Sequence, residues 1–453
     1  MTSVAPSALP GFLRKVAGNA VVLAHLPGQH SLPYAPRRRI EARRDARIAR
    51  MVRYAVRTVP HYRDLFRRLG LDARDVATAR DLERLPILDK DELVREPDRF
   101  VSTSSGGRRS IRFVSSGSSG KPARIHHDRR SLLENIAYGE RERRVTVAIL
   151  GRRLGYREAS VGYPNGTIQR VREFYGRVTF LARPSRLQLS VLDSFDTVVS
   201  RLNEFQPDVI TGFGNYLAAL SRAVKRGEIS LVRPKLYLYS AEGVTSDARR
   251  EMEEALGAPV LSHYSAVEIF KLGFLCEERT GFHVHEDLCH VRIVDPDGRD
   301  LPSGERGHVV VSNLVNRGTV LLNYRLGDVA SFTEGSCPCG RTLRRLADVE
   351  GRLEDMLPLP DGRLLHPRAV WGVLKRHPEV IQYQLVQRER HDFLLRLVTL
   401  DEDDHRRVSP LVAREMEDLL GTGARVSTER HERLTAEKTG KLRLVIALPA
   451  AST

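Results

Sequence analysis

The sequence predicts an α/β protein with a large N-terminal domain and a small C-terminal domain. At 453 residues, the chain exceeds what a single hydrophobic core usually supports, so we expect at least two domains. Between Ser115 and Leu261, predicted helices alternate with short apolar strands, which is typical of a parallel sheet covered by helices. A second, smaller alternation of helices and strands follows Glu354. We therefore place the domains at residues 1–353 and 354–453.

The bulk composition excludes a disordered or disulfide-rich protein. Hydrophobic residues make up 41% and charged residues 29%, as in ordinary globular proteins. Four cysteines cannot form a dense disulfide framework in a chain of this length. The apolar run Ala20–Ala24 is too short to span a bilayer. We therefore expect a cytoplasmic protein with no membrane span.

The chain is strongly basic, with 73 Lys+Arg against 57 Asp+Glu and a formal net charge of +16. Such an excess suits anionic partners, from nucleotides to acidic membrane surfaces. The densest basic run, Arg37 to Arg57, lacks interleaved aromatics and any nucleic-acid-binding signature, so we expect no nucleic-acid partner. A non-catalytic protein that binds polyanions or membrane surfaces through the helix near Arg38 to Arg57 is the alternative to an enzyme.

The first part of the chain predicts helices. Residues Ile40 to about Leu69 alternate arginine with apolar residues at helical spacing, and Val59-Pro60 breaks this run into two helices. A further helix within Asp81–Leu93 stops at Pro86 and restarts after Asp89.

A serine- and glycine-rich loop, Ser115–Pro122, separates two predicted short strands. Glycine permits close backbone approach, hydroxyls and amides donate hydrogen bonds and Lys121 supplies positive charge, so the loop can bind an anion. It is not a Walker A loop, because Gly117 and Gly120 are three apart and Pro122 follows the lysine. Taken alone, a flexible surface turn explains the loop equally well.

The parallel region follows this loop. Its expected elements are helix Leu187–Phe205, strand Asp208–Gly212, helix Tyr216–Arg226, strand Leu236–Ser240, helix Asp247–Leu256 and strand Pro259–His263. Ligands of such sheets bind beyond the carboxyl ends of the strands, where Glu242 and Tyr264 fall. From His283 to Phe332, short strands with Gly, Pro and Asp turns predict an antiparallel β subdomain at about 283–340.

Short motifs that are individually weak occur in one consistent order along the chain. They are Val59–Arg63, Leu85–Lys90, Ser115–Pro122, Ser240–Glu242, His263–Glu268, Gly304–His308, Asn323–Asp328, Gly351–Met356 and Thr439–Arg443. This ordered set resembles the adenylate-forming ligase superfamily, specifically its phenylacetate–CoA ligase-like and CapK-like branch. The resemblance extends from about Tyr54 to Val445, nearly the whole chain.

The resemblance implies an AMP-forming acid ligase that works in two steps. With ATP and Mg²⁺, a carboxylic acid is adenylated to an acyl-AMP, and the acyl group then passes to an acceptor, with coenzyme A (CoA) favoured. The large domain would bind ATP and the acid, and the small domain would be mobile and carry the catalytic lysine. The oligomeric state stays open, with a homodimer as one option.

The resemblance also implies roles for individual residues. Glu268 matches the family's magnesium-binding glutamate, and a hard oxygen ligand suits that ion. Tyr264 matches the aromatic residue that packs on adenine, Asp328 the carboxylate that accepts the ribose hydroxyls, and Lys441 the mobile catalytic lysine. As single residues each has an ordinary structural explanation, but their joint placement favours an active site. The other implied ATP contacts are Ser115, Ser116, Gly117, Ser118, Ser119, Gly120 and Lys121 in the phosphate loop, Ala241 and Glu242 at adenine, and Arg352 at ribose or phosphate.

Two departures from the family pattern concern the acceptor. The hinge position carries Glu354, where aspartate is usual, and Pro358–Arg363 replaces the Arg-Gly-Val-Asn-type loop of CoA-ligating relatives. Together with Gln382–Gln387, this segment is similar to relatives from capsular-polysaccharide and other biosynthetic loci. An amine, a hydroxyl or a carrier-protein thiol is therefore the alternative to CoA as acceptor.

Two further groups of residues are candidate ligands. A Cys₃His set suits tetrahedral structural zinc, as in some members of this branch, although His285 competes with His283 and four unrelated thiols are the plain alternative. An aromatic group beside strand ends suits an aryl or small cyclic acid, and core packing explains it equally well. The zinc candidates are Cys276, His283, Cys337 and Cys339, and the acid candidates are Tyr163, Phe213, Tyr216 and His263.

Overall fold

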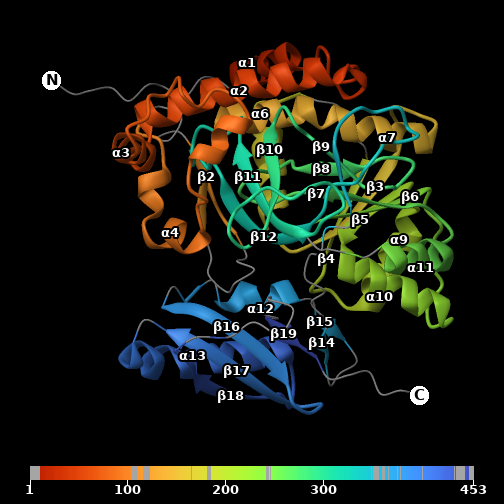
Figure 1. Ribbon diagram of the computed structural model, residues 1–453. Coiled ribbons are helices and arrows are strands. Elements are labelled where there is room, and N and C mark those ends of the chain that lie inside the picture. The colour runs from red at the N-terminus through yellow and green to blue at the C-terminus, as the bar shows by residue number, and fades with distance from the viewer. Residues whose placement is uncertain are drawn as a thin grey trace.

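The computed structural model begins with helices that lie along one side of the molecule (Figure 1). In chain order they are α1 (Gly11–His25), α2 (Arg37–Thr58), α3 (Pro60–Leu69) and α4 (Lys90–Arg95), with short 3₁₀ turns at Leu32–Tyr34, Arg80–Arg84 and Pro97–Phe100. The predicted break at Val59-Pro60 is confirmed: α2 ends before Val59, and Pro60 opens α3. Proline suits this first helical position because no helical partner is lost there.

The structure describes most of the chain, and the statements below concern this part. The described residues are 11–104, 110–115, 123–164, 166–180, 185–240, 244, 246–347, 349, 357–359, 363–365, 367–374, 376–377, 379–399, 401–432, 434 and 444–447.

The predicted strands on either side of the serine-rich loop form an antiparallel pair, β1 (Ser110–Val114) and β2 (Arg124–Asp128). Helices α6 (Arg129–Tyr138) and α7 (Glu140–Leu150) follow directly. Asp128 caps α6, because its side chain accepts a hydrogen bond from the Ser131 backbone N–H.

An eight-stranded sheet with the order β13-β9-β8-β7-β6-β5-β3-β4 forms the centre of the molecule. Strands β3 to β7 pair in parallel, whereas β8, β9 and β13 are added antiparallel. The strands are β3 (Arg157–Gly162), β4 (Ser185–Ser190), β5 (Val209–Phe213), β6 (Leu236–Ser240), β7 (Val260–Tyr264), β8 (Gly273–Leu275), β9 (Phe282–Val284) and β13 (Arg345–Leu346). The predicted α/β class with a parallel sheet is confirmed.

One predicted element of this region is wrong. The expected helix Leu187–Phe205 is an edge strand, β4, followed by the shorter helix α9 (Phe195–Phe205). Leu187 and Leu189 alternate with polar residues, a period-2 pattern that the parallel pairing of β4 with β3 uses. Helix α9 begins only after Ser194, whose side chain caps it by accepting from the Thr197 N–H.

Helices cover both faces of this sheet. Helices α9, α10 (Gly214–Lys225) and α11 (Ser246–Leu256) share an apolar core with one face, where Ile210, Tyr237 and Val260 are at most 1% exposed. Figure 1 shows these three helices together on one side. On the other face, α7 packs against the sheet through an apolar cluster that includes Val209 and Leu236, and α8 (Thr167–Val178) follows β3 in the chain.

A smaller antiparallel sheet, in the order β10-β11-β12, adjoins the large one. Its strands are β10 (Cys289–Val294), β11 (Gly307–Asn313) and β12 (Tyr324–Ala330). Its apolar residues belong to the same core as those of β7 to β9.

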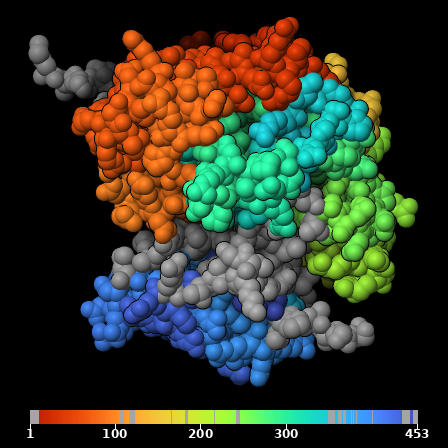
Figure 2. All heavy atoms as spheres, in the orientation of Figure 1, coloured from red at the N-terminus to blue at the C-terminus, as the bar shows by residue number. Residues whose placement is uncertain are grey.

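The residues from Leu357 onward have a core of their own and lie together below the rest of the molecule (Figures 1 and 2). A four-stranded sheet, β18-β17-β16-β19, packs with two helices, and a two-stranded sheet precedes it. The elements are β14 (Leu357–Pro358), β15 (Leu364–Leu365), α12 (Pro367–Leu374), β16 (Val380–Gln387), β17 (Asp392–Thr399), α13 (Glu402–Leu420), β18 (Arg425–Arg430) and β19 (Val445–Ile446). Within the described residues, no helix is both long and apolar enough to cross a membrane.

Candidate active site

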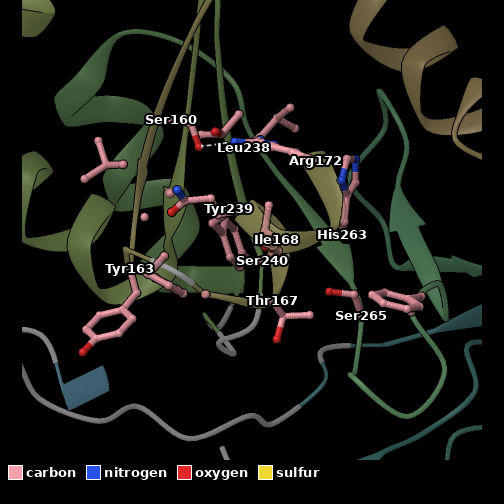
Figure 3. A pocket seen from close by; sticks show the side chains of 18 of the residues that line it. Ser160, Tyr163, Thr167, Ile168, Arg172, Leu238, Tyr239, Ser240, His263 and Ser265 are labelled. Atoms are coloured by element: carbon pink, nitrogen blue, oxygen red, sulfur yellow. Dashed lines mark hydrogen bonds between the residues drawn. The ribbon is translucent and has the colours of Figure 1, made fainter. Parts of the chain in front are cut away.

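A cavity of about 940 Å³ lies at the carboxyl ends of the parallel strands (Figure 3). Strands β3, β5, β6 and β7 contribute Gly162, Phe213, Ser240 and Tyr264, respectively, to its lining. From there the cavity continues along the sheet face that α7 covers. Open α/β sheets bind their ligands at this edge.

Four residues that are far apart in the sequence meet at one end of this cavity. Tyr264, at the end of β7, donates a hydrogen bond through Oη to Oδ2 of Asp328 on β12, at 2.8 Å. Ser115, directly after β1, donates to the buried carboxylate of Glu268 and accepts from the Ala123 N–H at 3.1 Å. Glu268, Asp328, Tyr264 and Ser115 all line the cavity, and the first residue of the serine-rich loop lies beside Glu268.

The environment of Glu268 suits a divalent cation. Burial raises the pKa of Glu268, Lys90 opposes this increase, and the negative charge of Asp328 adds to it. A buried carboxylate beside a second carboxylate is stabilised by a nearby positive charge. Glu268 offers the hard oxygen atoms that Mg²⁺ prefers, so its environment fits the predicted magnesium ligand.

Tyr264 is held as a neutral phenol. Burial raises its pKa well above the ordinary value, and the charge and hydrogen bond of Asp328 add to the effect. A phenol that keeps its proton donates to Asp328 and thereby fixes one carboxylate oxygen. The sequence could place both residues at the site, but it gave no signal for this hydrogen bond.

A buried ionic network, which sequence reasoning missed, lies behind the cavity. Glu142 on α7 forms an ion pair with Lys271, and both line the cavity. The other carboxylate oxygen of Glu142 is 3.1 Å from Nε2 of His285. Burial would raise the pKa of Glu142, but Lys271, His263 and His285 together lower it below its ordinary value. No short motif marks these residues, because their partners lie more than 100 positions away.

Three of the four predicted acid-binding residues line the cavity: Tyr163, Phe213 and His263. Tyr216 does not belong to its described lining. It lies in the first turn of α10 and packs in the core on the opposite face, with its ring 5.8 Å from that of Phe195.

Tyr163 also contacts the C-terminal unit. It packs against that unit's core, and a side chain at Gly372 on α12 would collide with the Tyr163 hydroxyl. Trp371, the neighbour of Gly372, lines the same cavity. The cavity is therefore closed in part by the C-terminal unit.

Several predicted site residues lie outside the described part of the chain. They are Ser116, Gly117, Ser118, Ser119, Gly120 and Lys121 of the loop, Ala241, Glu242, Arg352 and Lys441, together with the hinge position Glu354.

The predicted zinc ligands form a compact group at the antiparallel end of the large sheet. Cys276, His283, Cys337 and Cys339 offer four ligand atoms that all lie within 4.8 Å of one another. The Sγ atoms of Cys276 and Cys337 are 3.7 Å apart, and Cys339 Sγ is 3.3 Å from His283 Nε2. Tetrahedral zinc with bonds of about 2.3 Å needs separations of about 3.7 Å, so the group fits this ion. His283 belongs to the group, whereas the competing His285 faces Glu142.

Curated relatives of similar length share sequence with the chain. The phenylacetate-coenzyme A ligase of Thermus thermophilus is 28% identical and covers 93% of this chain and 99% of its own. The phenylacetate-coenzyme A ligase of Aromatoleum evansii is 25% identical (84% and 87%), and Protein CapK of Staphylococcus aureus is 20% identical (87% and 86%). No protein-family model matches the sequence.

Solved structures share the fold. A 2-hydroxyisobutyryl-CoA ligase in complex with its acyl-AMP and CoA, in the thioesterification state, has a TM-score of 0.63 at 18% identity and covers 93% of this chain and 91% of its own. The same ligase in the post-adenylation state has a TM-score of 0.60 at 19% identity, with the same coverage.

The fold, the cavity at its strand ends and the curated relatives together define an adenylate-forming ligase. Within that superfamily, the chain is similar over most of its length to the phenylacetate–CoA ligase-like branch, and it is an AMP-forming acid ligase.

Proposed function

We propose that the enzyme adenylates a carboxylic acid with ATP and then transfers the acyl group to CoA. One observation carries the proposal: Ser115, Glu268, Asp328 and Tyr264 meet at one end of a cavity whose other part extends along the sheet. The curated relatives named phenylacetate-coenzyme A ligase, and the solved ligase with acyl-AMP and CoA, support the same two steps.

In the first step, an oxygen of the acid attacks the α-phosphorus of ATP, and pyrophosphate leaves. Tyr264 would pack on adenine, and the Asp328 carboxylate would accept hydrogen bonds from the ribose hydroxyls. Glu268 would hold Mg²⁺, which supplies positive charge for the phosphates. The loop from Ser115 to Lys121 would bind the phosphates, with Arg352, Ala241 and Glu242 as further nucleotide contacts.

Lys441 would neutralise the acid carboxylate and the charge that develops at phosphorus. In the second step, the CoA thiolate attacks the acyl carbonyl carbon, the bond to phosphate oxygen breaks, and AMP leaves. A swing of residues 354–453 between the steps follows from the family resemblance. A cytoplasmic location and the homodimer stay predictions.

Part of the positive charge of helix α2, on which the alternative of a polyanion-binding protein rests, is used in ion pairs within the protein. Arg37 pairs with Glu286 at 2.5 Å, and Arg43 and Arg47 approach the buried Asp287 at 3.2 and 4.0 Å. These arginines therefore hold α2 against the body of the protein.

Acid-dependent exchange of labelled pyrophosphate into ATP tests the first step, with Lys441→Ala alongside. We expect exchange with at least one acid and its loss in the variant. A folded wild-type protein with no exchange for any acid in a broad panel would overturn the proposal.

AMP release with CoA, compared with amines, alcohols and a carrier-protein thiol, tests the second step. CoA is expected to give the highest kcat/KM. A higher value with an amine or alcohol would reassign the acceptor and leave the adenylation step intact.

We further propose that the Cys₃His group binds one structural zinc ion per chain. The separations of its ligand atoms support this, because they match tetrahedral coordination. Cys337→Ser should lose the zinc and lower the melting temperature, whereas Cys289→Ala, at a buried thiol outside the group, should keep one equivalent. Metal-free wild-type protein of undiminished stability would refute the zinc site.

A further inference from the structure

Part of the sheet face that lines the cavity, on β3 and the end of β5, is polar, which is unusual for a parallel sheet covered by helices. On β3, Glu158 and Ser160 are buried, at 8% and 7% exposure, and both point into the cavity. Thr211 on β5 is the register partner of Ser160 and also lines the cavity. The alternate residues Ala159 and Ile210 belong to the apolar core on the opposite face. A polar surface that is buried in this way needs hydrogen-bonding partners.

Arg172 faces this polar surface from helix α8. Its NH1 donates to Ser160 Oγ at 3.1 Å, and its NH2 lies 3.5 Å from Glu158 Oε1. The other oxygen of Glu158 accepts from Arg186 at 2.8 Å, so two guanidinium groups share one carboxylate. Figure 3 shows Arg172 reaching to Ser160, with His263 at its other side. Arg172 itself lines the cavity, with its side chain 24% exposed.

The strand register gives the depth of this group in the cavity. Gly162 marks the end of β3, and Ser160 precedes it by two residues, which corresponds to about 7 Å along the strand. The apolar side chains of Ile168 and Leu238 line the cavity as well. An acid whose carboxylate lies at the strand ends would therefore reach Arg172 and Ser160 with its far end, across one ring or a short carbon chain.

We propose that the acid carries an oxygen substituent at its far end, which accepts a hydrogen bond from Arg172. The inference rests on the proposed adenylation. A guanidinium group only donates hydrogen bonds, so a substrate group that contacts Arg172 in addition to Ser160 and Glu158 is favoured when it is an acceptor. A hydroxyl group meets this need and can also donate to Glu158, and a second carboxylate meets it through charge. A wholly apolar acid would displace water from Arg172 without replacing its hydrogen bonds, which is unfavourable.

Matched acids test this inference by pyrophosphate exchange. One series is phenylacetic acid with hydrogen, methyl, hydroxyl or carboxyl at the 4-position, and the other is hexanoic acid with the same groups at carbon 6. We expect kcat/KM for the hydroxyl or carboxyl acid to exceed that for its methyl analogue by about 10- to 100-fold. The two oxygen-bearing arms distinguish a neutral substituent from an anionic one.

Variants of helix α8 show whether Arg172 is the cause. Arg172→Met removes the charge and the donors, and the preference for oxygen-bearing acids should fall at least about 10-fold, with exchange for the methyl acids retained. Arg177→Met, at an exposed position of the same helix, should keep the wild-type preference. If Arg172→Met does not fold, Ser160→Ala, which loses the hydroxyl next to Arg172, should reduce the same preference several-fold.

The outcomes separate this inference from the proposed function. Exchange with the methyl acids at a kcat/KM equal to or above that of the oxygen-bearing acids overturns the inference alone. An unchanged preference in folded Arg172→Met overturns it as well. Exchange with another acid of the broad panel but with none in either series overturns the inference alone, whereas exchange with no acid of the panel overturns the proposed function, and the inference falls with it.

Discussion

The two faces of the large sheet are built from the same strands but differ in chemistry. On the face toward α9, α10 and α11, which we call the core side, Ile210 and Val260 are fully buried among apolar neighbours. On the other face, the cavity side, Glu158, Ser160 and His263 line the substrate cavity. Strand alternation allows this division because successive side chains point to opposite faces. One face can therefore stabilise the fold while the other binds ligands.

The largest expected effect is on the cavity side. Glu268→Gln should lower kcat/KM for pyrophosphate exchange about 10³-fold, equivalent to ~4 kcal/mol, because the proposed magnesium ligand loses its charge. Stability should stay equal or rise, because the buried carboxylate with its raised pKa is replaced by a neutral amide. Exchange kinetics and urea unfolding measure the two effects. A Glu268→Gln variant that loses stability and keeps its activity would contradict the assignment of ligand binding to the cavity side.

The core side should respond in the opposite way. Ile210→Ala should destabilise the protein by about 3 kcal/mol, because a fully buried side chain leaves a cavity, with unchanged kcat/KM for the folded fraction. Thr211→Val, at the neighbouring position on the cavity side, is the matched control and should change stability by no more than about 1 kcal/mol. Equal losses of stability at both positions would contradict the division.

The last expected effect is a pH dependence of stability that arises at His285, in the ionic network behind the cavity. Burial lowers the pKa of His285 to about 4, so the unfolded chain takes up a proton at a higher pH than the folded protein does. The contribution of neutral His285 to the free energy of unfolding is fully present above about pH 6.5. It falls by about 1.4 kcal/mol per pH unit as the pH is lowered to the pKa of His285 in the folded protein.

His285→Gln should flatten the loss of stability between pH 6 and pH 4.5, measured by urea midpoints at several pH values. His391→Gln, at an exposed position, should leave the slope unchanged. Parallel curves for wild type and His285→Gln would show that this histidine does not cause the acid sensitivity.

Local sequence patterns predicted the fold class and several residues of the candidate site. The alternation of elements predicted the parallel sheet, and the order of the motifs predicted that Tyr264, Asp328 and Glu268 share one site. Strand β4 was not predicted because its period-2 pattern consists of only two leucines, Leu187 and Leu189, which is too short to separate a strand from the start of the helix that follows. Tyr216 was predicted near the cavity because the sequence does not show toward which face of the sheet a residue in the first turn of a helix points.

The polar wall of the cavity could not be predicted in this way. Glu158 and Arg172 are ordinary charged residues in the sequence, and only the packing of α8 over β3 brings them together. The same holds for Glu142 and Lys271, which are linked across 129 positions. The zinc candidates were recognisable because cysteine is scarce in this chain, and the choice between His283 and His285 needed the structure.

Tyr163 belongs to two boundaries at once, since it lines the cavity and abuts Gly372 of the C-terminal unit. The Tyr163 ring therefore contacts both a ligand in the cavity and the C-terminal unit. A change in the position of this ring alters the shape of the cavity and the packing of that unit together. For inhibitor design, Tyr163 is therefore a position in the cavity from which the contact between the two units can be disturbed. A compound that moves the Tyr163 ring toward α12 would separate the two units while it occupies the proposed position of the acid.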